Sequence, residues 1–178
     1  EGSWKPKVPS LDAVPEGQGR MAAILGLEDS DVVSACEESA EGDVVAAVNF
    51  NAPGQVVIAG SAAAVERAIE ACKAKGARKA MPLPVSVPSH CALMKGAAEQ
   101  LAEALEDIRF NDAVIPVVQN VNAEPARDAE VLKANLLKQL YSPVLWTNSV
   151  QRLSTEGVGV AVECGAGGST LACVRACG

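Results

Sequence analysis

Short apolar runs and amphipathic stretches alternate along the first half of the chain. The apolar runs predict four strands, over residues 21–27, 44–50, 55–59 and 78–83. Two amphipathic stretches predict helices over residues 30–39 and 61–75. In the second of these, apolar side chains recur at helical spacing, at Ala62, Val65, Ala68, Ile69 and Cys72. The predicted order of elements is therefore βαββαβ.

Polar and glycine signals mark the ends of these elements. Asp29 or Ser30 is suited to cap the first helix and Ser61 the second, because their side-chain oxygens accept from free helical N–H groups. An Asn-Ala-Pro-Gly turn over residues 51–54 joins the two middle strands. The order βαββαβ is that of the split βαβ, ferredoxin-like arrangement. It predicts a small subdomain over residues 20–83, preceded by an unassigned, linker-like segment 1–19.

The pattern changes after Pro84. A long helix is predicted over residues 89–106, where apolar side chains occur at every fourth position, at Leu93, Ala97, Leu101 and Leu105. Two further helices are predicted over residues 128–140 and 142–153. Apolar runs predict a short buried strand at 114–118 and another strand at 158–164. Residues 84–178 thus form a second subdomain, and the fold class is α/β (α+β).

Composition narrows the function classes. The net charge is −7, which argues against nucleic-acid binding, since phosphates require a basic surface. No apolar run is long enough to span a bilayer, and no apolar leader opens the chain, so we expect a cytoplasmic protein without membrane contact. The six cysteines form no C-x-x-C pair and there is one histidine. Free thiols and no metal site are expected.

The one histidine, His90, follows two prolines in PVSVPSHCALM (residues 84–94). An imidazole can take and return a proton near neutral pH, so His90 is the candidate general base. The alternative is that His90 only caps or packs. Cys91 adjoins it, but neighbouring residues on a helix point in different directions, which disfavours Cys91 as a nucleophile.

Four segments together carry a family resemblance: GRMAAILGL (residues 19–27), VNFNAPGQVVIAG (48–60), PVSVPSHCALM (84–94) and QLYSPVLW (139–146). From about Ala13 to about Val162 the chain resembles the malonyl-CoA:acyl carrier protein transacylases of bacterial fatty-acid synthesis. The resemblance implies a ferredoxin-like subdomain followed by part of a larger, α/β-hydrolase-like subdomain. It also implies that His90 is the base of a Ser-His pair.

The resemblance implies a reaction and its partners. A serine attacks the thioester of malonyl-CoA, and the phosphopantetheine thiol of the carrier protein then takes the malonyl group, in ping-pong catalysis without a bound cofactor. Asn49, Asn51, Gln119 and Asn120 are implied near the substrate cleft, although an asparagine can equally serve a turn.

A basic cluster is formed by Lys73, Lys75, Arg78 and Lys79. These charges suit the C-terminus of a helix that Gly76 ends, because they complement its dipole. The family resemblance implies a second role, as a patch that binds the acidic acyl carrier protein.

The chain also departs from the family. No serine has glycine at both second-neighbour positions, as the nucleophile elbow Gly-His-Ser-Leu-Gly requires. The sequence Gly-Ala-Gly-Gly at residues 165–168 replaces the usual Gly-Pro-Gly-Lys, in a loop that helps orient the histidine. Residues 1–12 do not resemble the family. We therefore expect the second part of a transacylase, inactive by itself, with an exposed apolar face or sheet edge after Pro84.

Two other functions stay open. One is a noncatalytic module that binds a carrier protein or another subunit. The other is an acyltransferase for a different acyl group, because the arginine that pairs with the malonyl carboxylate in the family lies upstream of the matching stretch.

Overall fold

A computed structural model describes residues 14–15, 17–85 and 87–164. The first part of the fold is a four-stranded antiparallel sheet with two helices, in the predicted order of elements. The elements are β1 (Gly19–Leu25), α1 (Asp29–Ser39), β2 (Val45–Ala52), β3 (Gln55–Ser61), α2 (Ala62–Ala74) and β4 (Lys79–Pro82). The strands lie in the order β2-β3-β1-β4, so the fold is of mixed α/β type with an open sheet.

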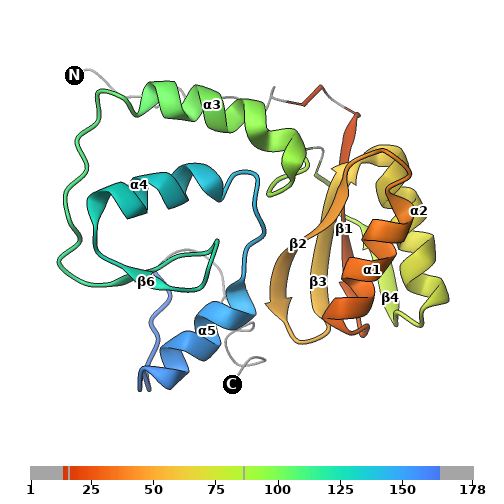
Figure 1. The fold of residues 1–178 in the computed structure, drawn as a ribbon. Helices are drawn as coiled ribbons and strands as arrows, with labels where there is room; N and C mark the ends of the chain where they lie inside the picture. The colour runs from red at the N-terminus through yellow and green to blue at the C-terminus, as the bar shows by residue number, and fades with distance from the viewer. Residues whose placement is uncertain (1–13, 16, 86, 165–178) are drawn as a thin grey trace.

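Alternating side chains divide this sheet into two apolar faces. On one face Ala22, Ile24 and Ile58 pack with Val32 of α1 and Val65 of α2, and all five are buried. Helices α1 and α2 lie side by side over this face (Figure 1). Val57 and Ala59 of β3 point to the opposite face, as the period of two in a strand requires.

The opposite face is covered by the residues around His90. Cys91 is buried there against Met21 and Val48, with Leu93 packed at the side. Leu83 N–H continues the ladder by donating to Met21 O at 2.9 Å. The segment that carries the histidine is therefore seated on the sheet.

The edge of the sheet at β2 is irregular and joins the second part of the chain. Extra residues in β2 shift its register with β3 near Val48 and again near Asn51. Val144 forms a parallel bridge with Asn49, in which Val144 N–H donates to Val48 O at 2.8 Å and Phe50 N–H donates to Val144 O at 3.0 Å. The bulge next to Asn49 thus lies where a strand-like segment of the second part pairs with β2.

The second part is mainly helical. Its elements are the 3-10 turn η2 (Ala92–Met94), α3 (Lys95–Ala104), β5 (Val117–Val118), β6 (Pro125–Ala126), α4 (Ala129–Lys138) and α5 (Trp146–Thr155). Helices α3 and α4 lie beyond the β2 edge of the sheet, with α5 next to β2 (Figure 1). None of the described helices is both long and apolar enough to cross a membrane.

Several predicted ends were wrong. Helix α1 starts after Glu28 rather than after Asp29 or Ser30, with no side-chain hydrogen bond at the cap. Ser61 does stand at the N-cap of α2, but its hydroxyl donates to Val44 O at 3.4 Å instead of accepting from the helix. The predicted helix 89–106 begins only at Lys95, because residues 90 and 91 are held by contacts distant in sequence. The predicted helix 142–153 begins at Trp146, because Val144 pairs with β2.

The two strands predicted after Pro84 were also wrong in part. Of residues 114–118 only Val117–Val118 form a strand, and Val114 is 89% exposed rather than buried. Residues 158–164 form no strand, and Val160 and Val162 are each 80% exposed. Val117–Val118 pair only with the two residues of β6, and the run at 158–164 has no partner strand in the described part of the chain, so the expected exposed apolar surface is present. Residues 1–12 and 165–168 lie outside the described residues.

Candidate functional site

His90 has an unusual backbone conformation. Its φ is +65°, in the left-handed region that non-glycine residues rarely adopt. Such strain costs on the order of 1 kcal/mol or more, and it persists where the surroundings hold it. Here His90 N–H donates to Leu140 O at 3.0 Å, from a segment about fifty positions away. The strained backbone therefore points the imidazole toward the end of α4.

The imidazole is oriented by a backbone carbonyl. His90 Nδ1 lies 2.7 Å from Gln139 O. A carbonyl oxygen only accepts, so in the neutral ring Nδ1 carries the proton and Nε2 has the free lone pair. The ring is half-buried, and Nε2 is the nitrogen that can act as a base.

The end of α4 supplies this carbonyl. Asp128 caps the start of the helix, its Oδ1 accepting from Val131 N–H at 2.9 Å, and Gln139 is the residue at the C-cap. The last carbonyls of a helix have no intrahelical donor and carry a partial negative charge. Two carbonyls at this end of the helix hold His90: that of Gln139 accepts from the ring, and that of Leu140 accepts from the backbone N–H.

Of the four predicted cleft amides, Asn120 lies closest to the histidine's partners. Its backbone O accepts from Leu145 N–H at 2.9 Å, and its Nδ2 donates to Gln139 Oε1 at 3.5 Å. Gln119 precedes it, with Nε2 donating to Val117 O at 3.1 Å. These amides line a cavity of about 360 Å³, together with Gln139 and with the apolar side chains of Phe110, Val117, Val118, Leu132 and Leu136.

Asn49 and Asn51 lie on β2, at the edge that receives the second part. Asn49 is bridged to Val144, only a few residues after Gln139 in the chain. Asn51 is half-buried further along β2, and the turn that follows consists of Pro53 and Gly54. Segment 139–145 therefore contacts His90, Asn120 and the β2 backbone at Asn49. Gln119 joins this group through the cavity that it lines with Asn120 and Gln139.

Cys91 is turned away from this arrangement. The sequence predicted that Cys91 lies on a helix, but in the structure it precedes the η2 turn in an extended conformation. Its side chain is buried on the sheet and its Sγ donates to Pro88 O at 3.1 Å. Burial raises the pKa of the Cys91 thiol, so the thiolate is disfavoured at neutral pH. The prediction that Cys91 is not a nucleophile agrees with this environment.

The basic cluster lies at the C-terminal end of α2 and the start of β4. Lys73 Nζ pairs with Glu70 at 2.8 Å, and Lys75 Nζ pairs with Glu38 at 3.0 Å. The bond from Lys75, followed by one from Ser34, lowers the pKa of the Glu38 carboxyl. All four basic residues are exposed, and exposed ion pairs contribute little free energy. Two lysines of the cluster are therefore paired within the chain. These ion pairs can be replaced by pairs with another molecule at little cost in free energy.

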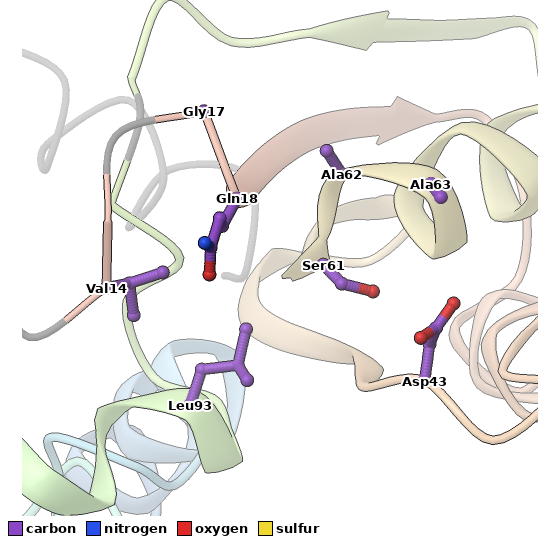
Figure 2. A pocket seen from close by; sticks show the side chains of 8 residues that line it. All are labelled: Val14, Gly17, Gln18, Asp43, Ser61, Ala62, Ala63 and Leu93. Atoms are coloured by element: carbon purple, nitrogen blue, oxygen red, sulfur yellow. The ribbon is translucent and has the colours of Figure 1, made fainter.

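A second cavity, of about 350 Å³, lies at the start of α2. Leu93 and Val14 border one side of it, and Ser61 and Asp43 the other (Figure 2). The Asp43 carboxylate forms an ion pair with Arg67 at 3.0 Å, so its charge is already balanced within the chain. This cavity lies between Leu93 of the η2 turn and the residues around Ser61, and His90 is not among the residues that line it.

Sequence analysis missed the two residues that hold His90, Gln139 and Leu140. They act through backbone carbonyls, which every residue has, so residue type gave no signal. The only available pointer was their place in the QLYSPVLW segment of the family resemblance.

Known proteins place this arrangement in a family. The model of the acyl transferase domain matches residues 12–174. The malonyl CoA-acyl carrier protein transacylase of Escherichia coli K12 is 56% identical over 156 residues, which are 88% of this chain and 50% of that protein. The Bacillus subtilis transacylase is 44% identical over 157 residues, again 88% and 50%. The chain thus spans about half the length of these relatives.

Solved structures agree. An acyl carrier protein S-malonyltransferase from Vibrio cholerae superposes with a TM-score of 0.93 at 50% identity, over 95% of this chain and 55% of that one. A malonyl-transacylase solved in complex with a type II PKS acyl-carrier protein gives 0.91 at 50% identity, over 93% and 54%. The chain belongs to the acyl transferase domain family, in agreement with its resemblance to the malonyl-CoA:acyl carrier protein transacylases.

Proposed function

We propose that this chain is the histidine-bearing part of a malonyl-CoA:acyl carrier protein S-malonyltransferase. The observation that carries the proposal is the bond between His90 Nδ1 and Gln139 O, which leaves Nε2 as a base. The similarity to malonyltransferases supports the acyl group and the carrier protein as substrates.

In the proposed reaction, Nε2 of His90 takes the hydroxyl proton from a serine as its oxygen attacks the malonyl-CoA thioester. The ring becomes positively charged while Nδ1–H stays bonded to Gln139 O, and this carbonyl at the C-cap of α4 stabilises that charge. The same proton then goes to the departing thiolate of coenzyme A. Deprotonation of the phosphopantetheine thiol by the neutral ring starts the second half-reaction. No bound cofactor is needed, and a cytoplasmic setting suits the substrates.

The proposed architecture has two subdomains. Residues 20–83 form a ferredoxin-like subdomain, supported by the βαββαβ order and the strand order β2-β3-β1-β4. Residues 84–178 form part of the larger hydrolase-like subdomain, supported by the exposed apolar runs near Val114 and Val160. The nucleophilic serine is not supplied by this sequence, because none of its serines lies in a Gly-x-Ser-x-Gly elbow.

The proposed substrate contacts follow from position. Asn49, Asn51 and Gln119 are assigned to malonyl-CoA or phosphopantetheine, whereas the Asn120 side chain bonds to Gln139. The cluster Lys73, Lys75, Arg78 and Lys79 is assigned to the acyl carrier protein. Its exposed positions and exchangeable ion pairs support this, since an acidic partner can replace Glu70 and Glu38.

The test is acyl transfer by a completed enzyme. The chain is fused behind the first half of the Escherichia coli transacylase, and malonyl transfer to acyl carrier protein is followed with His90→Ala and Cys91→Ala variants. We expect His90→Ala to lower kcat by several orders of magnitude, because an unassisted serine hydroxyl is a weak nucleophile. Cys91→Ala should stay within about threefold, because its thiol faces the sheet core. Near-normal turnover of His90→Ala, with the circular dichroism spectrum preserved, would contradict the assignment.

The same assay addresses the two alternatives. Offering acetyl-CoA or methylmalonyl-CoA beside malonyl-CoA tests the acyl group. The missing serine elbow favours one noncatalytic candidate, a carrier-protein-binding module. For that role the 178-residue chain should retain acyl carrier protein on a column without any transfer, and lose it when Lys73, Lys75, Arg78 and Lys79 are changed to Ala.

A further inference from the structure

We infer that Asn120 positions His90, acting through Gln139 rather than by touching substrate. This inference rests on the proposed function of His90 as a base. It moves Asn120 from the group of cleft amides to the support of the imidazole.

The need for such support comes from the end of α4. Gln139 stands at the C-cap, where a carbonyl has no intrahelical donor and its direction is not fixed by the helix. His90 takes its ring orientation from this carbonyl, at 2.7 Å. Whatever fixes residue 139 therefore also fixes the imidazole.

Asn120 contacts both ends of the segment that contains this carbonyl. Its side-chain Nδ2 donates to Gln139 Oε1 at 3.5 Å, and its backbone O accepts from Leu145 N–H at 2.9 Å. Beyond Leu145 the chain packs against β2, where Thr147 Oγ1 donates to Phe50 O at 3.0 Å. Asn120 thus bonds to both ends of segment 139–145, which joins the end of α4 to the start of α5.

The two bonds of Asn120 have different origins. The backbone bond to Leu145 survives any substitution, whereas the side-chain bond depends on the amide nitrogen. Asn120→Asp keeps the shape of the side chain but replaces the amide donor by a carboxylate oxygen, so the bond to Gln139 Oε1 is lost. The same change at Asn122, two residues on, is the matched control, since Asn122 Oδ1 accepts from Glu124 N–H and an aspartate retains that acceptor.

The single histidine makes the test direct. Ring ¹⁵N–¹H spectra of the ¹⁵N-histidine-labelled 178-residue chain contain one imidazole and report its tautomer at pH 8. We expect Nδ1–H in the wild type and in Asn122→Asp, and a mixture of tautomers in Asn120→Asp. Backbone amide spectra of the sheet verify that each variant is folded. An unchanged ring in folded Asn120→Asp, or a free-imidazole pattern in the wild type, would overturn the inference.

A double-mutant cycle tests the route through Gln139. Gln139→Ala removes the side-chain acceptor but keeps the backbone carbonyl, so Asn120→Asp should have little further effect on the ring in that background. In the completed enzyme we expect Asn120→Asp to lower kcat by on the order of 10-fold to 100-fold with KM within about twofold. A rise in KM with kcat unchanged would instead assign Asn120 to substrate binding. The ring spectrum does not depend on turnover. It therefore tests the role of Asn120 even if the completed enzyme fails to transfer malonyl groups.

Discussion

At the scale of single residues, the cysteines differ sharply in environment. Cys36, Cys72 and Cys91 are buried, while Cys164 is exposed. Burial raises the pKa of all three buried thiols, that of Cys36 to about 12, with the nearby Cys72 and Glu37 adding to the effect there. Neutral thiols react slowly with electrophiles, because the thiolate is the reactive form.

We therefore predict that iodoacetamide at pH 7.5 labels Cys164 well before Cys36, Cys72 and Cys91. Peptide mapping by mass spectrometry after timed quenching measures the order. The same mapping in 6 M guanidinium chloride is the control, in which the buried positions should become reactive. Labelling of native Cys91 as fast as Cys164 would contradict its placement in the core.

At Gly60 the absence of a side chain allows the backbones of two strands to approach closely. A Cβ added there would lie 2.0 Å from Val44 O and 2.6 Å from Val45 Cα, where β2 and β3 pair. We predict that Gly60→Ala lowers the free energy of unfolding by about 3 kcal/mol, because backbone must move apart. Urea unfolding followed by circular dichroism measures it.

Gly96 is the matched control for this change. It lies in α3, and in the described part of the chain a Cβ added there would meet nothing within 4 Å beyond its own helix. Gly96→Ala should therefore be neutral or stabilise by about 0.5–1 kcal/mol. Equal losses for the two variants would mean that the close approach at Gly60 is not what matters.

How far the sequence predicts the site is seen at His90. The motif around it singled out His90 as the candidate base, since residue type and spacing carry that signal. Its strained φ and its partners Gln139 and Leu140 could not be predicted, because a backbone carbonyl has no signature in the sequence. The pairing also joins positions far apart in the chain, and periodicity describes only near neighbours.

At the scale of elements, local signals predicted the first part well. The βαββαβ order followed from alternating apolar runs and from the Pro53-Gly54 turn, all within a few residues of each other. The apolar run at 158–164 was misleading for a physical reason: it is typical of a central strand, but a strand forms only beside another strand. Val160 and Val162 are exposed because no strand lies beside them in the described part of the chain, although the run itself is apolar.

Burial also differs between elements of the two parts. Helix α2 buries five of its side chains, whereas α4 buries none and α3 only Ala97 and Ala98. Few buried contacts mean that an element opens at low free-energy cost. We predict slow amide exchange in β1, β3 and α2 and faster exchange after Pro84, measured by hydrogen–deuterium exchange with mass spectrometry.

Within the second part, α5 should exchange more slowly than α4, because Thr147, Ser149 and Val150 of α5 are buried next to β2. Equal protection on both sides of Pro84 would contradict this difference. It would point to self-association, which repeating the exchange at a tenfold lower protein concentration would reveal.

At the scale of the whole molecule, the sequence contains a candidate base, His90, but no serine elbow. We predict that the 178-residue chain incubated with radiolabelled malonyl-CoA forms no stable acyl-enzyme, because removing a nucleophile costs several orders of magnitude in turnover. Acid precipitation followed by scintillation counting measures the label. The fused, completed enzyme is the positive control, and stoichiometric label on the chain alone would contradict the prediction.

The two edges of the four-stranded sheet have a consequence for aggregation. At one edge, Val144 already occupies hydrogen-bonding groups of β2. At the other, β4 is only four residues long and carries Lys79 and Pro82, a charge and a residue without a donor. Edges of this kind resist the addition of a foreign strand. Copies of the chain that do adhere to each other should therefore do so through the exposed valines at 158–162, and Val160→Lys should keep a concentrated solution clear under conditions in which the unchanged chain turns turbid.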